Sequence, residues 1–80
     1  MNQANVLERL QPLFDLLFLD PPRLRPDLSA KEVPEWDSLM QIQVVMAVEK
    51  EFKIKFRVGE VETTRNVGEF ADLILRRAST

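Results

Sequence analysis

The stretch DSLMQIQVVMAVEKEF, residues 37–52, has the apolar spacing of one amphipathic helix with two apolar faces. Ser38 followed three residues later by Gln41 matches the S-x-x-Q capping pattern, so we expect a helix from Ser38 to Lys53 with Ser38 as its N-cap. At 100° per residue the apolar positions fall on two arcs. The first arc holds Val44, Val45, Val48 and Phe52, and the second holds Leu39, Ile42 and Met46.

Only one of these faces can be fully buried against a neighbouring helix in a chain of 80 residues. The second arc is therefore a candidate exposed surface for a partner or a ligand. The alternative is that both faces are covered, one of them by a long loop, and the sequence leaves the two interpretations open.

A second amphipathic helix is predicted from Asn5 to Phe18, where apolar residues recur at spacings of three and four. Pro12 inside it removes one backbone donor, which predicts a kink or a frayed first half. Residues 20–36 hold four prolines and predict a long loop rather than a helix or a central strand. We expect this loop to be ordered, with three apolar side chains pinning it to the core: Leu24, Leu28 and Val33.

A last helix is predicted to begin at Asn66, since Asn66 with Glu69 forms an N-x-x-E start. Its buried face is expected to comprise Val67, Phe70, Ala71, Leu73 and Ile74. Residues 78–80 are expected to form a frayed tail. A short helical turn with Val61 pointing inward is expected within residues 58–63.

Residues 52–58 alternate between apolar and cationic side chains, as a half-buried strand does. No second strand is predicted to pair with it, so we interpret the segment as an extended connection. Its apolar members are expected to pack on the core and its cations to face water, and these are Phe52, Ile54, Phe56 and Val58 against Lys53, Lys55 and Arg57. The sequence therefore predicts an all-α fold, a small bundle of three or four helices with a long ordered loop between the first two.

The composition excludes several classes of function. The chain has no Cys and no His, so the usual metal-ligand sets and Cys or His catalytic arrangements are absent, and we expect neither a catalytic residue nor a bound metal. Eleven basic and 13 acidic residues give a net charge of −2, which argues against nucleic acid as a partner. With no apolar run of membrane-spanning length and no signal-peptide pattern, we expect a cytoplasmic, monomeric, free-standing single domain over residues 1–80.

Ser38 is the residue that could carry chemistry. A helix N-terminus presents unpaired N–H groups and the positive end of the dipole, so a phosphate esterified to a side chain there would be stabilised. The alternative is that Ser38 is only a helix cap, which is common for serine.

The triplet Asp37-Ser38-Leu39, the run from Val44 to Phe52 and the later stretch Val67-Gly68-Glu69-Phe70 together resemble the acyl carrier protein family over almost the whole chain. The resemblance implies that Ser38 carries 4′-phosphopantetheine, supplied by coenzyme A through a phosphopantetheinyl transferase, with Asp37 and Leu39 beside it. The thiol of that arm would hold acyl groups as thioesters for acyl-loading and acyl-transferring enzymes, and the chain itself would be no enzyme.

The family's partner-facing positions correspond here to Leu39, Ile42, Gln43, Met46, Glu49 and Lys50, which include the second apolar arc. The chain departs from the family in having Met40, Gln43 and Lys50 at positions that are commonly acidic, which weakens steering toward basic partners. This departure favours a specialised carrier in a dedicated lipid, polyketide or secondary-metabolite pathway. Two alternatives stay open: a helical interaction module without a prosthetic group, and an aminoacyl or peptidyl carrier.

Trp36 is a second departure, and we expect it to pack the loop end against the helix start. A cargo chain could be sequestered among Val45, Val48, Phe52, Ile54, Val61 and Ile74, although each is equally explained as core.

Overall fold

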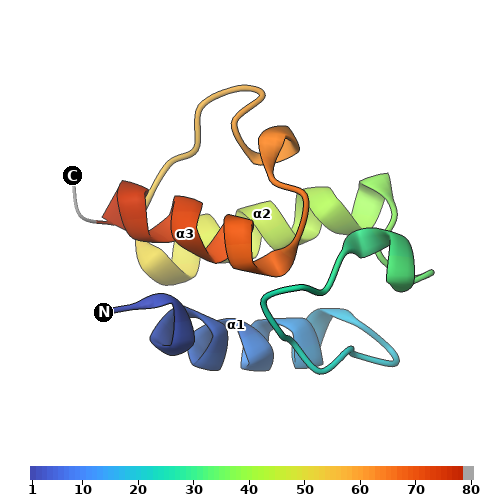
Figure 1. The fold of residues 1–80 in the computed structure, drawn as a ribbon. Coiled ribbons are helices and arrows are strands. Elements are labelled where there is room, and N and C mark those ends of the chain that lie inside the picture. Colours follow the sequence, from blue (N-terminus) through green and yellow to red (C-terminus); the bar gives the residue numbers. More distant parts are fainter. Residues whose placement is uncertain (79–80) are drawn as a thin grey trace.

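The computed structural model describes residues 1–78, which contain three α-helices and two 3₁₀ turns joined by loops (Figure 1). In chain order they are α1 (Gln3–Leu17), η1 (Ala30–Glu32), α2 (Ser38–Phe52), η2 (Val61–Thr63) and α3 (Val67–Ala78). The predicted all-α bundle is confirmed. Of the predicted tail, Ala78 is the last helical residue, and residues 79–80 lie outside the described part.

Helix α1 begins two residues earlier than the sequence predicts and runs unbroken through Pro12. Asn2 and Asn5 cap its start reciprocally, each side-chain oxygen accepting from the other residue's backbone N–H at 2.9 and 3.1 Å. The expectation of a frayed first half is wrong, because this cap and the full burial of Val6 and Leu10 hold that half in place.

The start of α2 differs from the prediction in one informative way. Asp37 is the N-cap: its Oδ1 accepts from the backbone N–H of Met40 at 2.9 Å, and Ser38 is the first residue inside the helix. The predicted Ser38 cap with Gln41 is therefore wrong, because Asp37 already satisfies the donor that Ser38 was expected to satisfy. The helix ends at Phe52, and Lys53 adopts the left-handed conformation with φ 56°.

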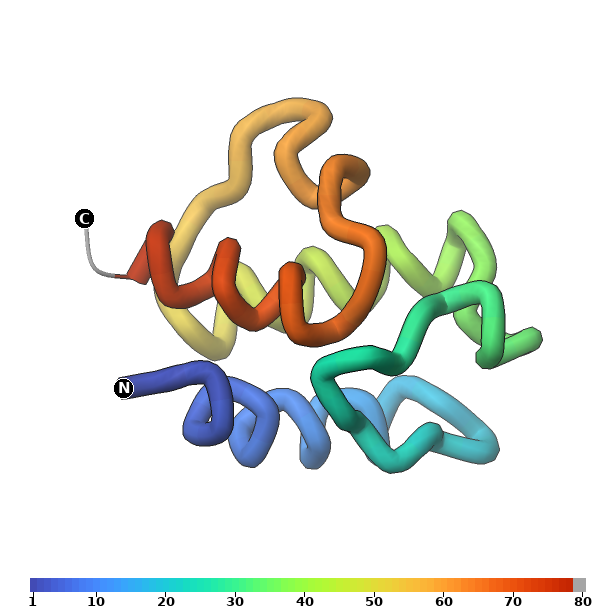
Figure 2. Tube along the Cα trace, in the orientation of Figure 1, coloured from blue at the N-terminus to red at the C-terminus, as the bar shows by residue number. Residues whose placement is uncertain are grey.

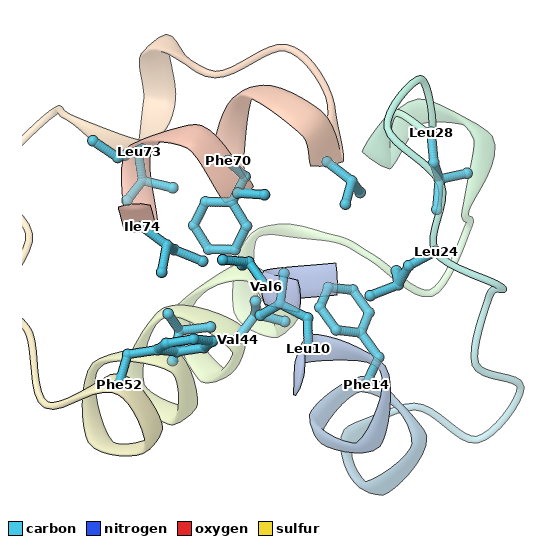
Figure 3. Close-up of a cluster of buried hydrophobic side chains, with 14 of the residues drawn as sticks. Val6, Leu10, Phe14, Leu24, Leu28, Val44, Phe52, Phe70, Leu73 and Ile74 are labelled. Atoms are coloured by element: carbon cyan, nitrogen blue, oxygen red, sulfur yellow. The ribbon is translucent and has the colours of Figure 1, made fainter. Parts of the chain in front are cut away.

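The core lies where α1 packs against both α2 and α3 (Figure 3). Each helix contributes large buried side chains to the core: Val6, Leu10 and Phe14 from α1, Val44, Val48 and Phe52 from α2, and Val67, Phe70, Leu73 and Ile74 from α3. The first arc of α2 is thus buried, apart from Val45, which is half-buried. The second arc is open, with Leu39, Ile42 and Met46 exposed by 72, 56 and 64%. This confirms the exposed-surface interpretation, since the long loop does not cover that face.

The loop between α1 and α2 is ordered, as predicted, with Leu24 and Leu28 buried and Val33 half-buried. It nevertheless contains the turn η1, which the proline content argued against. Ser29 caps this turn by accepting from the N–H of Lys31 at 3.1 Å. The turn is possible because the flanking prolines, Pro26 and Pro34, lie outside it.

The connection from α2 to α3 forms an arch that rises on the far side of α3 from α1 in the view of Figure 2. Ile54 is buried and Phe56 half-buried in it, while its three cations are exposed as expected. Val58 is fully exposed, so the expectation that it packs on the core is wrong. A turn closed by the N–H of Glu60 and the carbonyl of Arg57, with Gly59 at φ 82°, carries Val58 away from the core.

The arch returns to the core at η2, where Val61 is buried as predicted. Asn66 Oδ1 then accepts from the N–H of Glu69 at 2.8 Å, which confirms Asn66 as a cap of α3. The Glu69 carboxylate bonds the N–H of Arg65 at 2.9 Å, one residue earlier than the capping pattern predicts.

Candidate functional site

Ser38 stands exposed at the first position of α2. Its hydroxyl makes no hydrogen bond with the residues that the structure describes. Of the four N–H groups at the start of α2, Met40 and Gln41 donate to Asp37 at 2.9 and 2.8 Å, whereas Ser38 and Leu39 have no acceptor within residues 1–78. An accessible hydroxyl therefore lies beside two open amide donors at the positive end of a helix, an arrangement suited to a phosphate ester.

Trp36 packs the residues that precede Ser38 against the neighbouring helices. Its ring makes edge-to-face contacts with Phe14 of α1 and with Phe18, the C-cap of that helix, at centroid distances of 5.0 and 6.1 Å. Its indole N–H donates to Gln41 Oε1 at 2.5 Å. This confirms the expected packing role of Trp36 and shows why Gln41 takes no part in capping.

Glu35 ties the same junction to the end of α1. Its carboxylate accepts from the backbone N–H groups of Leu19 and Asp20 at 2.7 and 3.2 Å. Glu35 is thus anchored to the residues that follow α1, and Trp36 is anchored to Phe14 of α1 and to Gln41 of α2. Ser38 therefore follows a segment that is held in place by these hydrogen bonds and ring contacts.

A pocket of about 610 Å³ opens beside Ser38, between the start of α2 and the segment from η2 to α3. Its apolar walls include Trp36, Ile42 and Phe70, while its polar rim includes Arg65. The full lining is Ala30, Trp36, Asp37, Ser38, Gln41, Ile42, Val61, Glu62, Thr64, Arg65, Asn66 and Phe70. Of the six residues that the sequence suggested around a cargo chain, Val61 alone lines this pocket.

The predicted partner face follows the open side of α2. Its members Leu39, Ile42, Gln43, Met46 and Lys50 are all exposed. Glu49 is half-buried, and its Oε2 accepts from the backbone N–H of Phe56 at 2.9 Å. Glu49 therefore also anchors the beginning of the arch, a role that the sequence pattern did not reveal.

Three polar residues that line the pocket were not identified as site residues by the sequence analysis: Thr64, Arg65 and Asn66. Thr64, Arg65 and Asn66 reach the start of α2 only through the tertiary fold, so no local pattern could have identified them. The arch that delivers them is fastened to α3 by an ion pair between Glu60 and Arg77. The backbone N–H of Arg57, and then the Arg77 guanidinium, hold the pKa of Glu60 below its ordinary value.

This chain is similar to known proteins over most of its length. A family model described as a phosphopantetheine attachment site matches residues 35–74. An acyl carrier protein of Thermosynechococcus vestitus is 33% identical over 75 residues, which cover 92% of this chain and 93% of that protein. The solution NMR structure of a holo acyl carrier protein from Geobacter metallireducens matches with a TM-score of 0.84 and 35% identity, covering 92% of this chain and 86% of that one.

The helical fold, together with an attachment-site match that spans α2 and most of α3, defines the class of phosphopantetheine-binding carriers. Within this class, the chain belongs to the acyl carrier protein family. It is a carrier rather than an enzyme, and its prosthetic group is phosphopantetheine, whose thiol supplies the thioester chemistry. The surroundings of Ser38 fit such a group, since an unbonded hydroxyl, two open amides and a pocket meet there. No helix within residues 1–78 is long and apolar enough to cross a membrane.

Proposed function

We propose that Ser38 is the attachment residue of this acyl carrier protein. Its Oγ attacks the phosphorus of coenzyme A that bears the pantetheine, the hydroxyl proton is lost to a base of the transferase, and adenosine 3′,5′-bisphosphate leaves. The observation that carries the proposal is the exposed, unbonded hydroxyl of Ser38 at the N-terminus of α2 beside the pocket. Asp37 contributes by capping the helix, which sets the position of Ser38, and Leu39 places an exposed apolar contact next to it.

The same α2 surface is proposed as the docking face for the transferase and for acyl-loading and acyl-transferring enzymes. Leu39, Ile42 and Met46 supply its apolar centre. Gln43 and Lys50 supply polar contacts, and Glu49 lies at the end near the arch. Methionine suits a surface that must accept several partners in turn, because its side chain is unbranched and polarisable.

A dedicated lipid, polyketide or secondary-metabolite pathway is the setting that we propose for this carrier. Gln43 and Lys50 are exposed on the docking face, where they provide no negative charge to attract basic partner surfaces. Met40 lies two residues after the attachment residue and is likewise uncharged. Equal use of the holo protein and a housekeeping carrier by the main fatty-acid ketosynthase and malonyl transferase would contradict this setting. We further propose that residues 1–80 act as one monomeric carrier domain in the cytoplasm.

Intact mass after incubation with coenzyme A, Mg²⁺ and a promiscuous phosphopantetheinyl transferase tests the attachment. The wild-type chain is expected to gain one phosphopantetheine, and Ser38→Ala is expected to gain none. Ser29→Ala is the matched control, because Ser29 is another serine at a helical start and caps η1. A folded wild-type chain that gains no mass with two transferases would instead favour an interaction module without a prosthetic group.

The class of cargo is tested with the holo protein. Incubation with acyl-loading and with aminoacyl-loading enzymes, followed by intact mass, separates the two carrier types. We expect an acyl thioester, and exclusive loading with an amino acid would identify an aminoacyl or peptidyl carrier.

A further inference from the structure

The pocket beside Ser38 has a single cationic side chain in its described lining, Arg65. Its backbone N–H is bonded to Glu69 at 2.9 Å, but its guanidinium makes no ion pair or hydrogen bond with any residue from 1 to 78. Asp37 and Glu62 line the same pocket as carboxylates. The lining therefore carries an unpaired cation and an excess of negative charge.

The charge of this lining matters once a phosphodiester is attached. A phosphodiester on Ser38 adds one negative charge directly beside Asp37, and two like charges at short range repel in a partly enclosed site. The two open amides at the start of α2 offset part of this repulsion. A guanidinium offsets more, because its planar fork can donate to two phosphate oxygens together.

The backbone around Arg65 is hydrogen-bonded on both sides, while its guanidinium has no bond with residues 1–78. The N–H of Thr64 donates to the carbonyl of Val61 at 3.0 Å, which closes η2 immediately before Arg65. Asn66 caps α3 immediately after it, through a 2.8 Å bond from the N–H of Glu69. The fold thus holds the Cα of Arg65 at the pocket wall and leaves its long side chain available for a ligand.

We propose that the guanidinium of Arg65 binds the phosphodiester of the prosthetic arm and holds the first part of the arm against the pocket. This proposal rests on the attachment at Ser38 proposed above. It makes Arg65 a binding residue for the arm, supplied by the η2–α3 segment and separate from the docking face of α2.

The test compares apo and holo forms of the wild type with three variants: Arg65→Gln, Arg65→Lys and Arg23→Gln. Arg23→Gln is the matched control, because Arg23 is exposed in the first loop and lies outside the pocket lining. An excess of a promiscuous transferase loads each variant, and intact mass verifies the loading. The readouts are the ³¹P chemical shift of the phosphodiester and the change in Tm between apo and holo forms.

Arg65→Gln is expected to move the ³¹P resonance away from its wild-type position. The change in Tm from the apo to the holo form is expected to be less favourable in Arg65→Gln than in the wild type. Arg65→Lys should fall between the two, since it keeps the charge and loses the fork, and Arg23→Gln should match the wild type. At 1 M salt the Debye length is about 3 Å, so the difference in Tm between the holo forms of the wild type and Arg65→Gln should become smaller.

Loaded Arg65→Gln protein with the wild-type ³¹P shift and the wild-type change in Tm would overturn this proposal alone. A wild-type chain that gains no mass would overturn the attachment at Ser38 and the role of Arg65 with it. The mass measurement thus separates the two failures.

Discussion

The backbone N–H of Gly68 donates to the carbonyl oxygen of Pro26 at 2.8 Å, so the first turn of α3 is hydrogen-bonded to the loop that precedes α2. The N–H of Val67 makes a parallel bond to Leu28 at 2.8 Å. Gln3 Nε2 adds a 3.2 Å bond from α1 to the Gly68 carbonyl. Because Arg65 and Asn66 directly precede this anchored turn, the same contacts set the far wall of the pocket beside Ser38.

Gly68→Ala is expected to destabilise the fold, because an added Cβ would lie 2.9 Å from the Pro26 carbonyl oxygen and 3.1 Å from the Pro26 Cβ. Both neighbours belong to a proline whose backbone is held in the bond described above. Overpacking of this kind costs about 1–3 kcal/mol, which exceeds the gain in helix propensity from Gly to Ala. Urea denaturation measures the difference. Gln43→Ala on the exposed face of α2 is the control, and its free energy of unfolding should stay within about 0.5 kcal/mol of the wild type. If Gly68→Ala were as stable as the wild type, the loop that contains Pro26 would have to shift at no cost.

Trp36 is the single tryptophan of the chain, so intrinsic fluorescence reports directly on the junction beside Ser38. Trp36→Ala should cost about 3 kcal/mol, since it removes the contacts with Phe14 and Phe18. Trp36→Phe keeps an aromatic ring and loses the donor to Gln41, so it should cost about 1 kcal/mol. Circular dichroism during urea denaturation compares the variants, and equal losses in the two would contradict the proposed packing role.

Asp37→Ala should lower the free energy of unfolding by about 1 kcal/mol, because the N–H of Met40 loses its acceptor. Asp37→Asn should stay close to wild type, since an asparagine side chain caps nearly as well. Ser38→Ala should also leave stability nearly unchanged, because Ser38 is not the cap. Thermal denaturation of the three variants distinguishes these assignments, and a large loss in Ser38→Ala would restore Ser38 as the cap.

The helices could be predicted because each carries its own local signals. Apolar periodicity defined α1 and α2, and Asn66 defined the beginning of α3. The sequence alone could not decide whether Asp37 or Ser38 is the N-cap of α2. Both residue types cap well, and the two candidates differ only in whether the helix begins one residue earlier or later. The fraying expected from Pro12 is absent for a different reason: the local cost of a proline was outweighed by the cap at Asn2 and by tertiary burial.

The candidate site could be predicted only in part. Ser38 and the face that begins at Leu39 are contiguous in sequence or helical register, so their shared position followed from α2 alone. Arg65 lines the same pocket as Ser38 because of the course of the arch and the docking of Gly68 on Pro26. Neither contact has a local sequence signature, so the polar rim of the pocket required the structure.

The lowered pKa of Glu60, caused first by the backbone N–H of Arg57 and then by the Arg77 guanidinium, predicts a stability that depends on pH. Because the pKa of Glu60 is lower in the folded than in the unfolded chain, its contribution is fully present above the unfolded pKa. That contribution is lost as the pH falls through the lowered pKa of the folded state. The difference in unfolding free energy between wild type and Glu60→Gln should therefore be present at neutral pH and vanish in acid. Urea denaturation at a series of pH values measures it, and a difference that grew toward acid pH would contradict the assignment.

A substitution of Met46 can test docking without disturbing the fold, because the Met46 side chain is 64% exposed on the proposed partner face. Met46→Ala should change stability by less than about 0.5 kcal/mol. If partners dock on this face, the same change should lower the kcat/KM of the transferase for the apo protein about fivefold, as expected for a contact worth about 1 kcal/mol. Leu16→Ala is the matched control, since Leu16 is an exposed apolar residue of α1, 83% exposed and outside the face. Equal kcat/KM values for the two variants would contradict a docking surface on α2. A loss with Met46→Ala alone would support partner recognition by the apolar arc of α2 that is not buried in the core.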